Sequence, residues 1–144
     1  ASDVEEVTGG AVKQADLTKP LPTEEVFDWV LCSEVGEHIP KAFQEEFLDN
    51  VLDHAREGVV LTWSSTTGVG HVNCKANWQV INMLAIRGFS LDVGATVAMR
   101  RLVHGWFKPT AMVFRREARH LSLPAVAEEV AKEQQAFIMQ AATE

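Results

Sequence analysis

The sequence lacks most of the features that mark secreted, membrane-spanning or disulfide-stabilised proteins. It has only two cysteines, Cys32 and Cys74, in 144 residues, which is too few for a disulfide framework. No apolar run approaches the ~18–20 residues that cross a bilayer, and the acidic first residues, Ala1–Ala15, contain no apolar signal-peptide segment. We therefore expect no membrane span and no secretion, but a reducing intracellular compartment, either the cytoplasm or an organelle reached after processing.

Net positive charge is also absent. The sequence has 13 basic and 20 acidic residues and a formal net charge of −7, which argues against nucleic acid as a partner. The segment Ala98–His120 is an exception, because it holds one acidic residue, Glu117, and six basic ones: Arg100, Arg101, Lys108, Arg115, Arg116 and Arg119. Two interpretations of this segment stay open: a solvated basic face, or a docking surface for an acidic partner.

The length and composition are typical of one globular domain. Hydrophobic residues make up 47% of the 144 residues, which is enough for a substantial core. The first residues include the pair Gly9-Gly10 and few large apolar side chains, so we expect a loose arm over residues 1–15. We assign an α/β domain to residues 1–120, including that arm, and a C-terminal amphipathic helix to residues 121–144.

Short apolar runs alternate with amphipathic segments along the chain. Val26–Cys32 is a short apolar run that suits a strand buried on both faces. Apolar residues at helical spacing then predict a helix over Phe43–Ala55, which Gly58 would end. The later segments read in order as a strand at Val59–Trp63, a helix at Asn73–Arg87, an ambiguous stretch at Phe89–Arg101, a strand at Ala111–Phe114 and a helix at Leu123–Ala141.

Alternation of strands and helices predicts an α/β fold built from parallel βαβ units, with helices on the sheet faces. Ligands of such sheets bind at the carboxyl ends of the strands. The run FDWVLCSEVGEHIP, residues 27–40, places Glu34, Glu37 and His38 at such an end, and His71 follows the next strand. Glu37, His38 and His71 are therefore candidates for acid, base or hydrogen-bonding roles in catalysis. A purely structural role in a turn or loop is the alternative for each.

Several segments resemble, in order, the C-terminal portion of the class I S-adenosylmethionine-dependent methyltransferases. VKQADLTKPLP is similar to the end of their third strand, FDWVLCSEVGEHIP to the fourth strand and its ligand-facing turn, EGVVLTWS to the fifth strand and TAMVFRR to the terminal antiparallel strand. GHVNCKANWQVINMLAIRGF resembles the loop and helix after the fifth strand in small-molecule members. The resemblance implies a partial Rossmann-like sheet of parallel strands with a terminal antiparallel strand, flanked by helices.

The same resemblance implies S-adenosylmethionine as cofactor, with contacts at Asp16, Leu17, Ser33 and Glu34. Asp16 has an equal alternative, an Asx turn or cap before the following proline. The Gly-rich loop that holds the cofactor in this family is missing. Nine glycines are present, but none forms a Gly-x-Gly-x-Gly run, and 15 residues precede Asp16, fewer than the ~30 of a βαβ unit. We therefore expect the cofactor not to bind this chain tightly.

The spacing of potential metal ligands does not predict a metal centre. Cys32, His38, His71 and Cys74 come from strand ends that should be neighbours, so a zinc site is geometrically conceivable. No pair has Cys-x-x-Cys spacing, however, and Cys32 lies in an apolar run that suits a core cysteine. The sequence therefore predicts no metal.

Two functions from different classes fit these features. In the first, the chain is a non-catalytic, methyltransferase-like subunit with a structural or interaction role in a larger assembly. In the second, it is an active S-adenosylmethionine-dependent methyltransferase acting on a small molecule, completed by an upstream segment or another chain. The strand Val26–Cys32 would lack its usual neighbour, so we expect its flank to be covered by a different protein, a second copy or the arm Ala1–Gln14.

Overall fold

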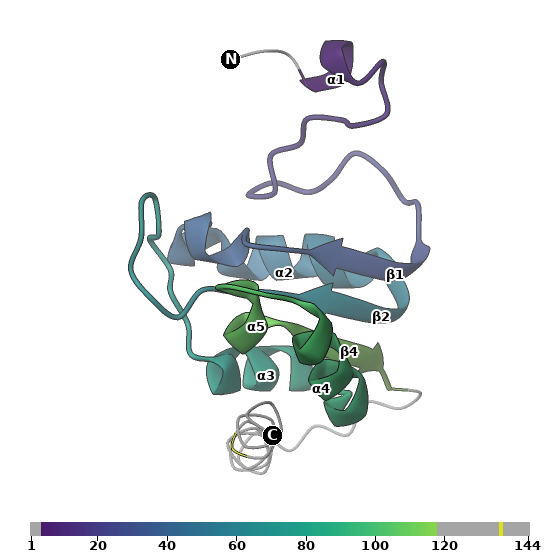
Figure 1. Ribbon diagram of the computed structural model, residues 1–144. Helices are drawn as coiled ribbons and strands as arrows, with labels where there is room; N and C mark the ends of the chain where they lie inside the picture. The colour runs from purple at the N-terminus through teal and green to yellow at the C-terminus, as the bar shows by residue number, and fades with distance from the viewer. Residues whose placement is uncertain (1–3, 118–135, 137–144) are drawn as a thin grey trace.

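A four-stranded mixed sheet with helices on both faces forms the body of the protein (Figure 1). The structure is a computed structural model that describes residues 4–117 and residue 136. Among these residues, no helix is both long and apolar enough to cross a bilayer. The elements follow in the order α1 (Val4–Val7), β1 (Phe27–Cys32), η1 (Gly36–His38), η2 (Lys41–Phe43), α2 (Gln44–Asp53), β2 (Ala55–Leu61), α3 (Asn77–Ala85), β3 (Phe89–Leu91), α4 (Val93–Leu102), α5 (Phe107–Thr110) and β4 (Met112–Arg116).

The strands lie in the order β1-β2-β4-β3. β1 and β2 are parallel, as predicted, with Val30 opposite Val59 and Cys32 opposite Leu61. β4 runs antiparallel to both β2 and β3. The α/β class and the antiparallel last strand are therefore confirmed, but only one of the three strand pairs is parallel.

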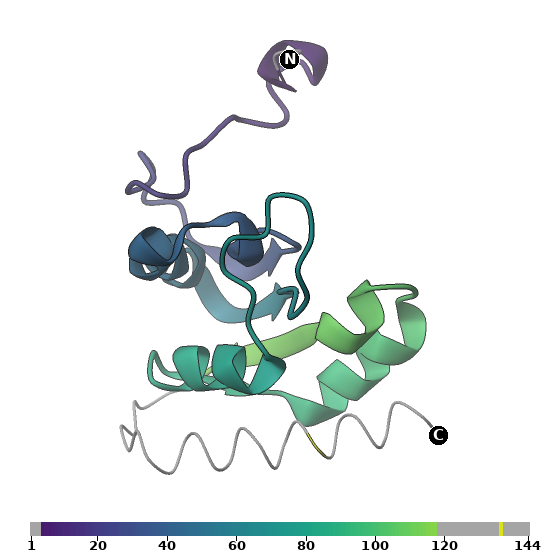
Figure 2. The same ribbon diagram turned by 90° about the vertical axis from the view of Figure 1, so that its left-hand side faces the viewer.

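The core lies between one face of the sheet and the helices α2 and α3. Paired residues point to the same face, so Cys32, Leu61 and Met112 share a side with Val59 and Phe114. The predicted helix face is buried against them, and the core includes Phe47, Leu48, Val51 and Leu52 from α2 and Val80, Ile81 and Leu84 from α3. The helix α4 covers part of the opposite face (Figure 2), where the hydroxyl of Thr96 accepts a 2.9 Å hydrogen bond from the amide of Val113.

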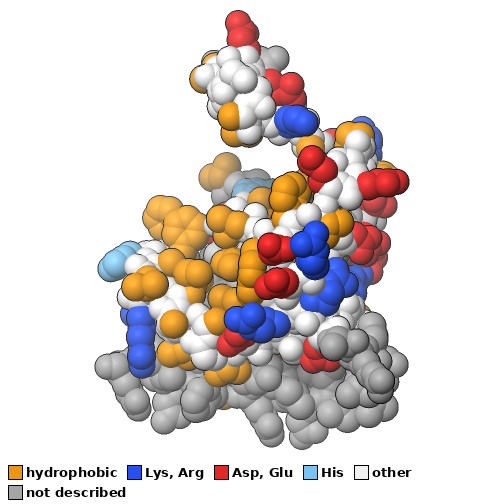
Figure 3. All heavy atoms as spheres, turned by 90° about the vertical axis from the view of Figure 1, so that its right-hand side faces the viewer, with side chains coloured by type: hydrophobic (Ala, Val, Ile, Leu, Met, Phe, Trp, Pro, Cys, Tyr) orange, Lys and Arg blue, Asp and Glu red, His pale blue; other side chains and the backbone are white. Residues whose placement is uncertain are grey.

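The prediction that β1 is buried on both faces is wrong. Phe27, Trp29 and Leu31 are 53%, 38% and 73% exposed. These alternate residues lie on the face opposite the core, and among the residues that the structure describes β1 pairs only with β2. In Figure 3, hydrophobic side chains gather on one area of the surface beside acidic and basic groups. β1 is thus an apolar edge strand.

The boundary between the first long helix and the second strand also differs from the prediction. The helix α2 ends at Asp53, and β2 runs from Ala55 to Leu61 instead of from Val59 to Trp63. Gly58 lies within β2 and does not end the helix. A Cβ atom there would lie 2.4 Å from the Trp29 ring and from the Phe114 carbonyl oxygen, so this glycine permits close packing across the sheet.

Further elements fall close to their predicted positions. The second long helix is shorter than predicted, at Asn77–Ala85. The ambiguous stretch is both a strand and a helix, β3 and α4, separated by Asp92, whose side chain accepts a hydrogen bond from the amide of Ala95. The predicted helix Leu123–Ala141 and Arg119 of the basic segment lie outside the described residues.

The N-terminal arm stands away from the sheet, with one helical turn, α1, near its start (Figure 1). The connector that follows the arm is fixed to α2 by Asn50. Its amide nitrogen donates to the carbonyl oxygens of Leu17 and Lys19, at 3.1 and 2.8 Å, and its oxygen accepts from the amide of Leu21. The connector therefore crosses α2 before the chain enters β1. The described part of the arm, residues 4–14, does not cover the outer edge of β1 (Figure 1).

Candidate functional site

The turn after β1 carries most of the predicted site residues. Glu34 has a left-handed backbone with φ of 55°, which is uncommon for a residue with a side chain. Its amide donates a 2.8 Å hydrogen bond to the hydroxyl of Thr62 at the end of β2. Gly36 then packs so closely on the indole of Trp63 that a Cβ atom would lie 2.4 Å from the ring. These contacts turn the chain sharply into η1, which carries Glu37 and His38.

Backbone hydrogen bonds bring the loop after β2 onto this turn. The carbonyl oxygen of Glu37 accepts from the amides of Val72 and Asn73, at 2.8 and 3.0 Å. The carbonyl oxygen of Asn73 in turn accepts from the buried indole nitrogen of Trp63, at 2.7 Å. As a result His71, two residues before Asn73, lies beside His38 although 32 residues separate them in the sequence.

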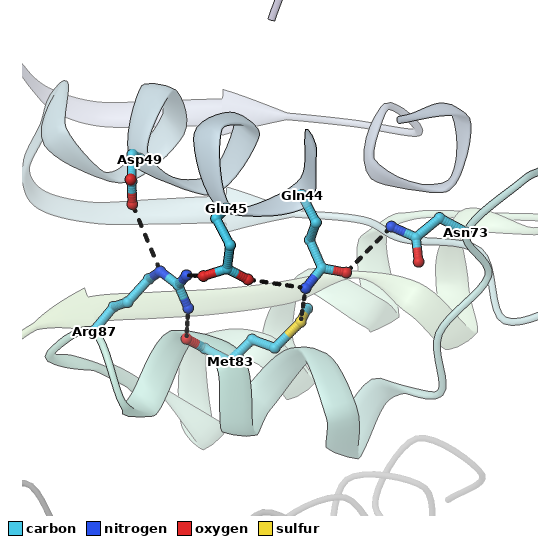
Figure 4. Close-up of polar contacts among 6 residues, drawn as sticks. All are labelled: Gln44, Glu45, Asp49, Asn73, Met83 and Arg87. Atoms are coloured by element: carbon cyan, nitrogen blue, oxygen red, sulfur yellow. Dashed lines mark hydrogen bonds and ion pairs between the residues drawn. The ribbon is translucent and has the colours of Figure 1, made fainter. Parts of the chain in front are cut away.

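A polar network also holds Asn73 against the helices on the core face (Figure 4). The side-chain amide of Asn73 donates to Gln44 at the start of α2, and Gln44 in turn contacts the sulfur of Met83 in α3. Arg87 pairs with Glu45 and donates to the carbonyl oxygen of Met83. The amide of Asn73 is therefore used structurally, and the network fixes the base of the loop that carries His71.

Glu37, His38 and His71 form a compact cluster. Their potential ligand atoms all lie within 4.8 Å of one another. The two imidazole rings meet edge to face, with centroids 4.9 Å apart and an interplanar angle of 89°. The structure thus brings together the three residues that the sequence predicts as catalytic. Whether they act in catalysis stays a prediction.

Glu37 is an unusual member of this cluster because its side chain is fully buried. Neither of its carboxylate oxygens has a hydrogen-bond partner among the described residues. Burial raises the pKa of Glu37, and the neighbouring carboxylate of Glu34 adds to the rise. The amides of Glu37 and Ser64 and the charge of His38 oppose the shift, but neither amide reaches the carboxylate in hydrogen-bonding geometry. The site therefore penalises an isolated negative charge.

The hydrogen bonds of the two histidines define their neutral tautomers. Nδ1 of His38 lies 3.0 Å from the carbonyl oxygen of Gly70, and Nδ1 of His71 lies 2.8 Å from that of Thr66. A carbonyl oxygen only accepts, so each Nδ1 carries the proton and each neutral ring keeps a lone pair on Nε2. Nε2 is the nitrogen left for a proton, a metal ion or a substrate.

The residues predicted to contact a cofactor do not form one group. Leu17 and Ser33 line an apolar groove of about 530 Å³ along β1, together with Phe27, Val30, Leu31, Val35 and Val51. Glu34 is adjacent in sequence but belongs to the turn, where its charge acts on Glu37. The groove lies between β1, the connector and α2. It could accept an apolar ligand or an apolar segment of polypeptide.

Asp16 is occupied by local contacts. Its carboxylate accepts from the amide and hydroxyl of Thr18, at 3.0 and 2.6 Å, and pairs with Lys19 at 2.9 Å. These interactions, led by the Thr18 hydroxyl, lower the pKa of Asp16 to about 2. The arrangement is the Asx turn that the sequence left open as an alternative.

The four zinc ligands considered from the sequence do not come together as a set. Cys32 is buried, and burial raises the pKa of its thiol to about 12. Cys74 lies closer, with its sulfur 3.9 Å from Nδ1 of His71. Within the described part of the chain, however, the ligand atoms that cluster belong to Glu37, His38 and His71, and neither cysteine is a member.

The sequence did not predict how this cluster is assembled. Asn73 was considered, beside His71, as a residue that could orient a substrate group or simply pack in the loop, and Trp63 and Gln44 were assigned to a strand and a helix. In the structure these three residues connect the two histidine-bearing segments. The one available signal was the pair of small residues, Gly36 and Gly70, placed beside the histidines. A Cβ atom at Gly70 would lie 3.2 Å from Nδ1 of His38.

Comparison with known proteins adds no relative: no family model matches the chain, and no curated protein matches it.

Proposed function

We propose that this chain is a methyltransferase-like subunit, non-catalytic as given, that joins a larger assembly through the open edge of β1. The partner is another polypeptide that adds an extended segment to that edge. The observation that carries the proposal is the exposure of Phe27, Trp29 and Leu31 on an edge strand. Apolar edge strands are normally covered, because their unpaired backbone groups invite further strand pairing.

The arrangement of the sheet supports the methyltransferase-like part of the proposal. The resemblance implies that the fourth and fifth strands are parallel neighbours and that the last strand is antiparallel. β1 and β2 are such a pair, and β4 is antiparallel to β2. The same resemblance implies a further strand on the outer side of β1. A polypeptide that supplies this strand would bury the apolar face of the edge.

The groove beside β1 supports the same surface as a contact. It continues from Leu31 and Val35 to the connector residue Leu21. Strand addition combines main-chain hydrogen bonds with pockets for alternate side chains, and an edge strand beside an apolar groove offers both.

The candidate cofactor contacts support a non-catalytic role. The carboxylate of Asp16 is engaged by Thr18 and Lys19, and no Gly-x-Gly-x-Gly run exists to approach a cofactor closely. Each missing polar contact is worth about 1–3 kcal/mol. Several such losses lower affinity by a few powers of ten.

A second candidate is an active S-adenosylmethionine-dependent methyltransferase on a small molecule, completed by an upstream segment or another chain. One observation favours it: Leu17 and Ser33 line a groove at the strand end that also bears the Glu37 cluster. In that case a second polypeptide would complete the cofactor pocket rather than only cover the edge.

Calorimetry with S-adenosylmethionine on the purified chain separates the two candidates. We expect no tight binding, for the reasons above. A micromolar dissociation constant would overturn the non-catalytic proposal and favour the second candidate. Ser33→Trp, which would fill the groove, is the matched variant: it should abolish any binding that uses the groove and leave unrelated binding unchanged.

A further inference from the structure

Among the residues that the structure describes, the buried carboxylate of Glu37 lacks a hydrogen-bonded counter-charge. Its side chain has no exposed surface, and neither of its oxygens has a hydrogen-bond partner there. Buried charges in proteins are normally paired or coordinate a metal, because an isolated charge loses its hydration without compensation. The other potential ligand atoms of the cluster are the nitrogens of His38 and His71, and neutral imidazoles bring lone pairs rather than positive charge.

The two histidines are prepared in the way that metal-binding histidines usually are. Metal-ligating histidines donate their other ring N–H to a carbonyl or carboxylate, which fixes the ring and its tautomer. His38 and His71 do this with the carbonyl oxygens of Gly70 and Thr66. The ring of His71 also packs on Gly68, where a Cβ atom would lie 2.9 Å from the ring. Protein contacts, including the hydrogen bond at each Nδ1, therefore hold both rings in place.

We propose that Glu37, His38 and His71 bind a divalent first-row transition-metal ion. A carboxylate and two imidazoles suit zinc, manganese or iron, and the set is that of open, three-ligand sites. The positive charge of the ion would balance the buried carboxylate. Water or a substrate oxygen would fill the remaining positions. This assignment does not depend on the partner proposed for β1.

The observed spacing requires a modest closure on binding. Two ligands that each lie 2.0–2.1 Å from a tetrahedral ion are about 3.3 Å apart. The potential ligand atoms here, counting either ring nitrogen of each histidine, lie within 4.8 Å of one another, about 1.5 Å more than that separation. His38 is exposed and His71 half-buried, so small shifts of these two side chains, with their Nδ1 hydrogen bonds kept, would supply this closure. Glu37, held by packing, is the fixed point of the site.

Cobalt titration of the full chain tests this site, with Co²⁺ as the probe and Zn²⁺ as competitor. Tetrahedral Co²⁺ has characteristic visible absorption, so the spectrum reports coordination directly. We expect saturation at one equivalent, displacement by Zn²⁺, and a rise in melting temperature. Glu37→Gln, His38→Ala and His71→Ala should each weaken binding at least about 100-fold, more than the 10–100-fold typical of second-shell changes.

The chain offers matched controls. Glu57→Gln and His104→Ala change exposed residues outside the cluster, and both should bind as the unaltered chain does. Cys74→Ser should keep the spectrum, because the thiol is not in the cluster. Far-UV circular dichroism on each variant checks folding. His71→Ala keeps the test valid if Glu37→Gln does not fold, because His71 lies on a loop.

Three results would overturn the assignment. The first is no saturable Co²⁺ binding by the folded chain. The second is binding that survives both His38→Ala and His71→Ala. The third is loss of the spectrum in Cys74→Ser, which would show that the thiol of Cys74 is a ligand of the ion.

Discussion

Gly36 lies against the indole ring of Trp63, and this contact fixes the turn that carries Glu37 and His38. A Cβ atom on Gly36 would lie 2.4 Å from the ring, which is fully buried. Gly36→Ala should therefore lower the free energy of unfolding by about 1–3 kcal/mol, the range for overpacking a core. Chemical denaturation followed by tryptophan fluorescence measures this change.

The control for Gly36 is Gly94, near the start of α4. There the nearest atom to an added Cβ is 3.7 Å away, an ordinary contact. Gly94→Ala should be neutral or should stabilise the protein by up to ~1 kcal/mol, because alanine favours the helix. Equal destabilisation by the two substitutions would show that the contact with Trp63 is not what restricts position 36.

At the scale of single residues, the sequence predicted which residues form the cluster better than it predicted the surroundings of those residues. Glu37, His38 and His71 were found because polar residues follow two apolar runs. Their mutual contact depends on the amides of Val72 and Asn73, which donate to Glu37. A loop of Ser, Thr and Gly has no period from which such a contact could be derived. The complete burial of Glu37 was unpredictable for the same reason, because a glutamate in a turn is usually solvated.

Asp92 links β3 to α4 and should stabilise the protein in a pH-dependent way. Its carboxylate accepts from the amide of Ala95, at 2.8 Å, and from Nε of Arg115, at 2.7 Å. These contacts lower its pKa. A lowered pKa means that the stabilisation is present above the ordinary carboxyl pKa, ~3.9, and is lost as pH falls through the folded value.

Asp92→Ala should accordingly lower the free energy of unfolding by about 0.5–2 kcal/mol at neutral pH, the range for a lost helix cap. The difference from the unaltered chain should shrink below pH ~4. Thermal melts across this range measure it. Asp53→Ala, an exposed change at the end of α2, should show no comparable loss. A penalty that stays constant with pH would contradict the role of the ionised carboxylate.

The helix α2 depends on one apolar face. Val51 is 6% exposed and belongs to the core cluster. Val51→Asp would bury an unpaired charge, so we expect loss of cooperative unfolding. Val69→Asp introduces the same charge at a residue that is 99% exposed. The free energy of unfolding of this variant should stay within ~0.5 kcal/mol of that of the unaltered chain. Calorimetry distinguishes the two outcomes. A cooperative transition in Val51→Asp would mean that the face is misassigned.

At the scale of elements, hydrophobic periodicity predicted which segments are helices and which are strands, but local packing determines where each one begins and ends. The central part of the α2 face, Phe47 to Leu52, was predicted correctly because its apolar residues repeat at helical spacing. The predicted ends were wrong, because Phe43 is 46% exposed and Ala55 belongs to β2. Gly58 was interpreted as a helix stop, since glycine often has that role, whereas here it accommodates the ring of Trp29. β1 was predicted as buried because an apolar run does not say whether anything covers it. Only the topology shows that it is an edge.

At the scale of the whole molecule, the two proposed surfaces lie on different elements and can be tested separately. The apolar surface is on β1, and the metal cluster is on the turn after it and the loop after β2. Sequence order predicted that β1 and β2 are neighbours, because short crossovers favour parallel pairing. It did not predict that β3 lies at the far edge with β4 between β2 and β3, since strand order within a sheet is not encoded by local periodicity.

The open edge of β1 is the central claim, and light scattering on matched variants tests it most directly. Leu31, on β1, and Leu102, on α4, are 73% and 75% exposed. We expect the unaltered chain to self-associate in the absence of its partner. Leu31→Lys should restore the monomer, because a charged side chain on an edge strand blocks further pairing, whereas Leu102→Lys should leave association unchanged. A clean monomer for the unaltered chain at all accessible concentrations, or equal effects of the two substitutions, would contradict the account.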